Sequence, residues 1–156
     1  MNEHEQMMCE LQGEFFELSV ERLKCGSAIF AMRFMHSETA KDLDNIDDPY
    51  NFVSPNNLIS VMKRVFPKLG SQVGQKYPPH VMKWIGYIYR AWNIIKRERS
   101  ARIYELIKIE KMAALYDTFH TFDPSYCVER LEEIANEQRQ NPKSDYEIFK
   151  EIMLSK

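Results

Sequence analysis

The sequence predicts an all-α single domain, an irregular bundle of about six to eight helices around one central apolar helix at 79–97. Apolar residues recur at spacings of three and four along most of the chain, which is typical of amphipathic helices. Proline and glycine divide these segments, and none alternates apolar and polar residues as a half-buried strand does. With 156 residues, the chain can bury one core as a single domain, 1–156.

The amino-terminal part of the chain predicts a helical hairpin. Residues 4–24 place apolar side chains on one face and glutamates largely opposite, and the glycine at 26 ends this helix. Ser27 and Ser37 are expected to cap two further short helices, because a serine hydroxyl can accept from the free N–H groups of a first turn. The last of these helices ends before Asp44.

Proline marks both ends of the next helix. Residues 44–55 combine acidic side chains with proline and asparagine, which favours a loop. Ser54 and Pro55 place a capping hydroxyl before a proline at the first helical position, and the helix that follows stops at Pro67. Residues 67–79 contain glycines and prolines and predict a flexible connection.

The segment 79–97 is expected to form the centre of the core. Because its tyrosines and isoleucines make nearly every face apolar, other helices must surround it. Lys96, Arg97 and Arg99 near its carboxyl end complement the negative end of the helix dipole. One continuous stripe is formed by Val81, Trp84, Ile85, Ile88, Trp92 and Ile95.

Further helices are predicted towards the carboxyl end. Ser100 is expected to restart a helix, and the apolar pattern continues to Phe119. A capping aspartate followed by proline at 123–124 begins another helix, which Asn141 closes, and Ser144 caps a last one.

Composition and charge exclude several classes of protein. The net charge of -2 removes the simplest electrostatic case for nucleic-acid or membrane-surface binding. Cys9, Cys25 and Cys127 are odd in number and far apart, which suits free thiols in a reducing compartment. The acidic amino terminus does not resemble a signal peptide, and no apolar run is long enough to span a membrane. A cytoplasmic protein without a membrane segment is therefore expected.

No motif predicts a cofactor or a metal. The histidines His4, His36, His80 and His120 are isolated from one another, whereas a zinc site favours paired ligands on one short segment. None of the glycines forms a phosphate-binding loop. The sequence therefore predicts no cofactor, no metal and no catalytic machinery of a familiar kind.

One group of residues near the end of the central region has the types that a thiol enzyme uses. His120, Asp123 and Cys127 could supply a base, an orienting acid and a nucleophile. Their spacing argues against this, since Asp123 is explained as a helix cap and Cys127 falls on the apolar face of that helix. An enzyme with an unfamiliar site near His120 stays an alternative.

The strongest local charge is the basic stretch KRERSAR at 96–102. Together with Tyr87 and Arg90, it could present an aromatic and basic surface, 87–102, to nucleic acid or to an acidic protein. The other interpretation is a solvated helix terminus whose cations complement the helix dipole. A nucleic-acid-binding regulator is therefore the first alternative function.

Residues 84–134 resemble a family of short, uncharacterised helical proteins of Gram-positive bacteria. The shared elements are W-x-G-Y-x-Y-R-x-W, a short I-Y helix, and F/Y-H-T-x-D/S-P, which occur here from Trp84 to Trp92, at 103–104, and from Phe119 to Pro124. This sequence departs from the family after Trp92, where NIIKRERSAR replaces a more polar linker, and in its added segment from 141 onwards.

The resemblance implies a protein partner. Genes of the family lie beside genes for other small proteins, including ones that resemble ADP-ribosyltransferases, in clusters suggestive of toxin–antitoxin modules. We therefore expect a helical protein-binding module, of antitoxin-like or regulatory character, whose partner is encoded nearby; self-association into a homo-oligomer stays open. The candidate partner surface is Tyr87, Arg90, Arg97, Arg99, Arg102, His120 and Asp123.

Arg90 has a second, structural interpretation. Trp84 and Trp92 are two turns apart on one face of the central helix, whereas Arg90 lies elsewhere on it. Its guanidinium could pair with Asp123 or reach carbonyls near His120, and would then fix the central helix against the carboxyl-terminal element.

Overall fold

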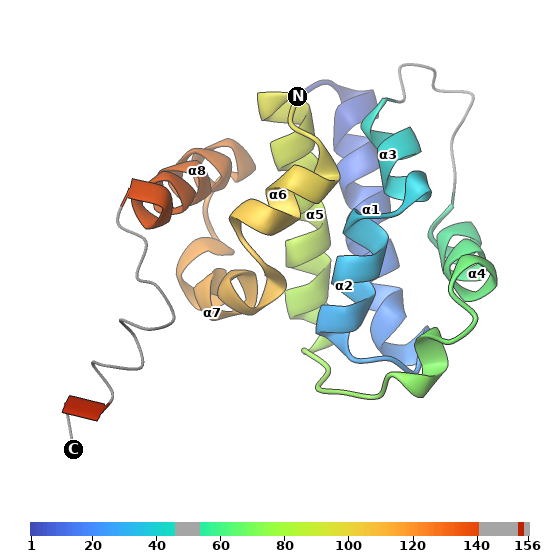
Figure 1. Cartoon of the computed structure of the whole chain (residues 1–156). Coiled ribbons are helices and arrows are strands. Elements are labelled where there is room, and N and C mark those ends of the chain that lie inside the picture. Colours follow the sequence, from blue (N-terminus) through green and yellow to red (C-terminus); the bar gives the residue numbers. More distant parts are fainter. Residues whose placement is uncertain (46–53, 141–152, 155–156) are drawn as a thin grey trace.

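The computed structural model describes residues 1–45, 54–140 and 153–154, and all regular structure in these ranges is helical (Figure 1). This confirms the predicted all-α bundle. No helix in the described residues is both long enough and apolar enough to cross a membrane. The main helices there are α1 (Glu3–Arg22), α2 (Ser27–Met35), α3 (Glu38–Asp44), α4 (Pro55–Val65), α5 (Pro79–Lys96), α6 (Ser100–Leu106), α7 (Ile109–Phe119) and α8 (Pro124–Gln140), with a 3-10 turn, η2 (Leu69–Ser71).

Helix α5 occupies the centre of the bundle, as predicted. Helix α1 packs along it, and α6, α7 and α8 contact it from other sides (Figure 1). Ile85, Ile88 and Trp92 of the predicted stripe are buried, whereas Trp84 and Ile95 are only half-buried. The predicted boundaries hold within one residue, because Arg97 leaves the helix in a left-handed conformation.

Four phenylalanines join α1 to α2. The ring of Phe15 lies 4.9 Å from that of Phe34 and 5.2 Å from that of Phe30, in both cases edge to face. Phe16 makes the same kind of contact with Phe30 at 5.0 Å. Each pair contributes about 0.5–1.5 kcal/mol beyond the burial of its area. This cluster explains why the short helix α2 stays against α1.

The predicted helix caps are partly confirmed. The Ser37 hydroxyl accepts from the N–H of Ala40 at 3.1 Å, and Ser54 caps α4 in the same way. The prediction for Ser27 is wrong, because Gly26 is the residue before the first turn of α2. The Ser27 hydroxyl instead accepts from the N–H of Tyr77 at 3.0 Å.

Residues 67–79, the predicted flexible connection, bond to the turn between α1 and α2. The N–H groups of Gly26 and Ser27 donate to the carbonyls of Gln72 and Gln75, at 3.1 and 2.9 Å. The ammonium of Lys76 also donates to two carbonyls at the end of α1, each at 2.7 Å. The backbone polar groups of the α1–α2 turn have no partners within a helix. They bond to this segment instead, which holds it against the turn.

Two other predictions change in the structure or fall outside it. The apolar pattern from Ser100 to Phe119 belongs to two helices, α6 and α7, which the extended backbone of Ile107 separates. Most of the loop predicted at 44–55, the end signal at Asn141 and most of the helix predicted from Ser144 lie outside the described residues.

Helices α1 and α5 approach each other closely at Gly86. A Cβ atom on Gly86 would lie 2.6 Å from the Gln12 carbonyl oxygen and 2.7 Å from Cγ of Phe16. At Gly13, on the facing helix, it would lie 3.0 Å from the carbonyl oxygen of Lys83. The absence of both side chains therefore sets the distance between the two longest packed helices.

Substituting Gly86 tests this contact. We expect Gly86→Ala to lower the free energy of unfolding by about 1–3 kcal/mol, because the added methyl group must displace backbone. Helix propensity alone predicts the opposite, a gain of roughly 1 kcal/mol. The control is Gly70→Ala, where the nearest atom would lie 3.9 Å away and stability should be unchanged. Urea denaturation measures both; a Gly86→Ala protein as stable as wild type would contradict the close approach.

Candidate functional site

The buried guanidinium of Arg90 is the most extensively bonded side chain of α5. Its side chain is 1% exposed. Nε donates to Oε1 of Gln12 at 2.8 Å, and Nη1 donates to Oδ1 of Asp44 at 2.7 Å and to Oδ1 of Asn93 at 3.0 Å. Gln12 in turn donates to the carbonyl of Gly86 at 2.9 Å, at the close approach of α1 and α5.

Asp44 carries the same network on to α6. Its carboxylate accepts from the N–H of Ser100 at 2.9 Å and from the Ser100 hydroxyl at 2.5 Å. A carboxylate at the first free N–H of a helix acts as a cap, although this one comes from a distant part of the chain. Ser100 therefore begins α6, as predicted, but its hydroxyl donates to Asp44 rather than capping the helix.

Arg90 makes internal contacts, but not the predicted ones: it bonds Gln12 of α1 and Asp44 of α3, so it does not fix α5 against the carboxyl-terminal element. Asp44 takes the place predicted for Asp123, which accepts from the N–H of Ser125 at 2.8 Å as the cap of α8. Arg90 is also wrong as a member of the partner surface, because it is buried. Burial lowers the pKa of its guanidinium, and the adjacent Asp44 carboxylate opposes that shift.

Only part of the predicted aromatic and basic surface at 87–102 is exposed. Arg97, Arg99 and Arg102 are exposed, but Tyr87 is half-buried. Tyr89 is buried and donates its hydroxyl to the carbonyl of Ile107 at 2.7 Å.

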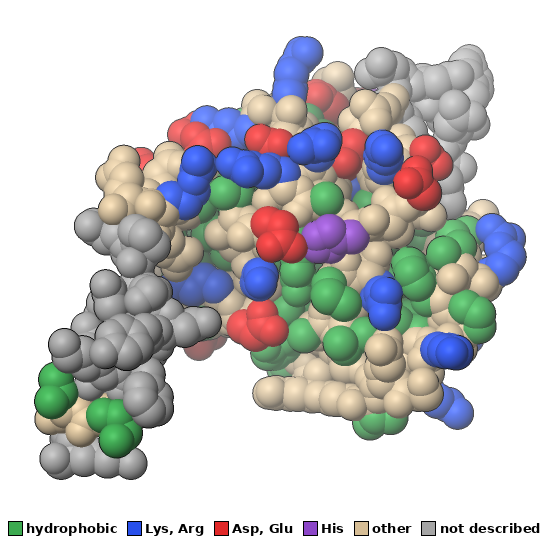
Figure 2. Space-filling model, viewed as in Figure 1, with side chains coloured by type: hydrophobic (Ala, Val, Ile, Leu, Met, Phe, Trp, Pro, Cys, Tyr) green, Lys and Arg blue, Asp and Glu red, His purple; other side chains and the backbone are tan. Residues whose placement is uncertain are grey.

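Lys96 is also engaged within the chain. Its ammonium lies 2.6 Å from Glu129 and 3.6 Å from Glu132, two carboxylates of α8. Lys and Arg side chains alternate with Asp and Glu along one edge of the face in Figure 2. These neighbouring acids weaken the support for a phosphate-tracking surface.

The residues of the proposed thiol site make separate contacts. The Cys127 thiol is buried and donates to the carbonyl of Phe119 at 3.2 Å, and burial raises its pKa, with a smaller contribution from Asp123. His120 is exposed, with Nδ1 2.8 Å from the carbonyl oxygen of Tyr116 and its ring stacked on that tyrosine. These contacts favour a packing role for Cys127.

An apolar hollow of about 580 Å³ opens between α2, α6 and the ends of α4 and α7. Its floor includes Ile29, Met32 and Phe66, which are half-buried. Hydrophobic side chains gather over α2 and towards α4 in the face drawn in Figure 2. Its other lining residues include His36 and the charged side chains of Arg33, Glu105, Lys108 and Glu110.

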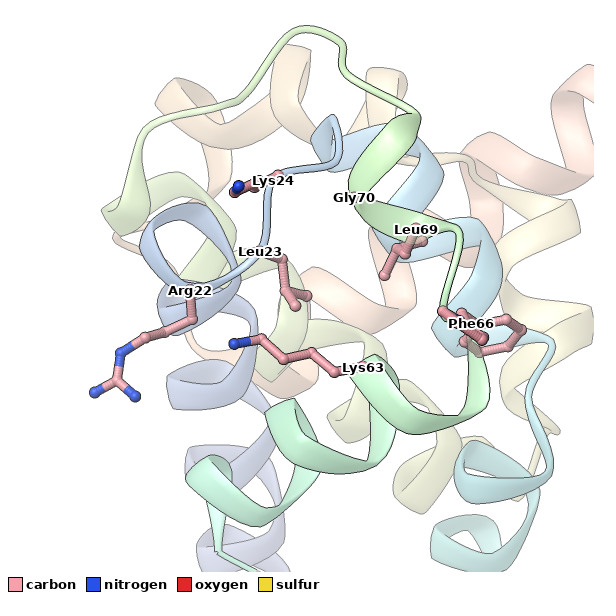
Figure 3. Close-up of a pocket in the computed structure, with 8 residues that line it drawn as sticks. Arg22, Leu23, Lys24, Lys63, Phe66, Leu69 and Gly70 are labelled. Atoms are coloured by element: carbon pink, nitrogen blue, oxygen red, sulfur yellow. The ribbon is translucent and has the colours of Figure 1, made fainter.

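A second hollow of about 220 Å³ adjoins the first through Phe66, which lines both. Leu23 and Leu69 point into it and Phe66 lies at one end (Figure 3). Its charged lining residues are Arg22, Lys24 and Lys63. We call the residues of these two hollows the Phe66 surface.

The Phe66 surface is positive although the chain is negative. Five lysines and arginines line the two hollows, against two glutamates. One of those glutamates, Glu105, already lies 3.0 Å from Nε2 of His36. The guanidinium of Arg33 stacks over the Phe66 ring at 5.7 Å, a cation–π contact that holds charge beside the apolar floor.

The sequence reasoning missed this surface. The hydrophobic residues of 27–35 and Phe66 fit the pattern of ordinary amphipathic helices, and only the packing shows that part of each face stays uncovered. The cations are spread over 22–108, so no local run of charge predicts them.

Searches with family models, curated proteins and solved structures gave no match to this chain. Within the described residues, no group of three or more His, Cys, Asp or Glu side chains is placed to hold a metal ion.

The reactivity of the three cysteine thiols tests whether they are buried as the structure shows. Burial raises the pKa of Cys9 to about 12 and also raises the pKa values of Cys25 and Cys127. We expect none of the three to react with a disulfide reagent at pH 8 in the native protein, and all three to react after unfolding, because the thiolate is the nucleophile. Rapid native labelling of Cys127, located by mass spectrometry, would contradict its buried position and revive a thiol site near His120.

Proposed function

We propose that this chain is a helical protein-binding module and that its partner docks at the Phe66 surface. The observation that carries the proposal is the pair of adjoining hollows around Phe66, which combine an apolar floor with an excess of cations. Burial of such a floor supplies affinity, and the charged rim selects the partner and its orientation.

The charge of the surface defines the chemistry of the partner. A segment that fits it places apolar side chains over Ile29, Met32 and Phe66 and carboxylates beside Arg22 and Lys63. An amphipathic helix with one acidic flank has these properties. The resemblance of residues 84–134 to proteins from toxin–antitoxin-like clusters supports a partner encoded by a neighbouring gene and an antitoxin-like or regulatory role in a small bacterial operon.

A matched pair of variants tests the proposal. Each product of the neighbouring genes is co-expressed with the full chain, and complexes are detected by size-exclusion chromatography with light scattering. Met32→Glu places a charge on the apolar floor and is expected to weaken a wild-type complex at least tenfold, by roughly 1.4 kcal/mol or more. Val73→Glu adds the same charge at an apolar residue that is 79% exposed and outside both hollows, and should leave the complex intact.

The possible outcomes distinguish a neighbouring gene product from a second copy of the chain as the occupant of the Phe66 surface. A neighbour's complex that is lost with Met32→Glu and weakened by salt supports the proposal. A complex that survives Met32→Glu, or no complex with any neighbouring product, contradicts it. A homodimer that dissociates with Met32→Glu would show that a second copy occupies the surface and would likewise overturn the proposed partner. Circular dichroism confirms that each variant is folded.

A further inference from the structure

A third hollow, of about 380 Å³, lies beside the buried Arg90 and is separate from the Phe66 surface. The first turns of α1, the end of α3 and the end of α5 form its walls. Its volume is in the range of small-molecule sites. We call it the Arg90 hollow.

Two buried nitrogen atoms without a partner belong to residues of this hollow. Among the described side chains, His4 Nε2 and Arg90 Nη2 are the buried nitrogen or oxygen atoms that make no hydrogen bond. Both His4 and Arg90 line the Arg90 hollow. Nε2 of His4 donates or accepts depending on the tautomer, whereas Nη2 of Arg90 is always a donor. Because a buried donor without an acceptor costs about 1–3 kcal/mol, this Nη2 indicates that an acceptor from outside the chain completes the site.

The backbone of Arg97 is a second, independent sign. Among the described residues, Arg97 is the one non-glycine residue with positive φ, at φ 53° and ψ 39°. It lies at the end of α5, where glycine is the usual residue in this conformation. An arginine in this conformation is strained, and such strain is typical of positions kept for function. Arg97 lines the Arg90 hollow, and so does the exposed residue Arg99.

The charges of the hollow define the class of ligand. Arg90, Arg97 and Arg99 face three acids, Glu5, Asp44 and Glu98. Each acid already accepts a hydrogen bond within the chain: Glu5 from the N–H of Asn2, Asp44 from Arg90, and Glu98 from the N–H of Arg99.

The formal charge of the hollow is balanced, and Nη2 of Arg90 is a donor in it that makes no hydrogen bond within the described chain. This combination suits a small ligand with one oxyanion and disfavours a polyanion such as nucleic acid. We propose that the Arg90 hollow binds a small molecule through a single carboxylate or phosphate group, whose oxygens accept from Nη2 of Arg90 and from the guanidinium of Arg97.

The test is a titration of the full chain followed by ¹H–¹⁵N NMR, with inorganic phosphate and with acetate as separate probes, each to about 20 mM at constant ionic strength. The expected result is a saturable shift of the Arg90 Nε–H and Arg97 N–H signals with at least one probe. The probe that saturates distinguishes a phosphate source from a carboxylate source.

Arg97→Gly separates binding from folding. Glycine adopts the left-handed conformation without strain, so this variant should unfold at the same or a higher temperature than wild type. It should nevertheless bind the probe roughly tenfold or more weakly, because it lacks the guanidinium. Arg102→Gln is the matched control, since Arg102 is exposed on α6 and does not line this hollow.

Three results would overturn the inference. These are no saturable shift with either probe, equal binding by Arg97→Gly and wild type, or an equal loss with Arg102→Gln, which would indicate unspecific attraction to surface charge. None of them bears on the Phe66 surface, so the failure of this inference and the failure of the proposed function are distinguishable.

Discussion

The guanidinium of Arg90 and the carboxylate of Asp44 meet in the interior of the bundle, 2.7 Å apart. Neither charge could stay there alone, because moving an ion out of water is compensated only by a partner and by further hydrogen bonds. Gln12 and Ser100 supply those bonds, so one buried pair connects α1, α3, α5 and α6. The direction in which α6 leaves the end of α5 depends on Asp44, which caps its first turn from a distance.

This arrangement places the two candidate binding regions at different positions around α5. The Arg90 hollow lies beside the buried pair, and Arg90, whose Nη2 donor the pair leaves unused, lines it. The Phe66 surface depends on the opposite property, an apolar floor that the short helices α2 and α6 leave uncovered between them. The close contact at Gly86 supports both, since it fixes α1 against α5 and with it the Phe15 and Phe16 side chains on which α2 packs.

Periodicity and end signals predicted the helices well because those signals are local. The proline and capping residues at 54–55 and 123–124 each begin a helix, and the apolar segment at 79–97 is central. Local patterns could not predict which acid reaches Arg90: Asp44 is 46 residues away and lies at the start of an acidic stretch whose members look alike. They could not predict the Phe66 surface either, because uncovered area is a property of packing. Of the arginines predicted on one partner surface, Arg97, Arg99 and Arg102 are exposed, whereas Arg90 is buried.

The most direct test of the buried pair is a double-mutant cycle of Arg90→Met and Asp44→Ala by urea denaturation, with exposed Asp42→Ala as the control. Asp44→Ala leaves the Arg90 charge without its partner and should lower the free energy of unfolding by about 3–5 kcal/mol, whereas Asp42→Ala should change it by under roughly 0.5 kcal/mol. The double variant should be more stable than the sum of the single changes predicts, by about 2 kcal/mol or more. Additive effects within roughly 0.5 kcal/mol would contradict the account, because the two charges would then not depend on each other.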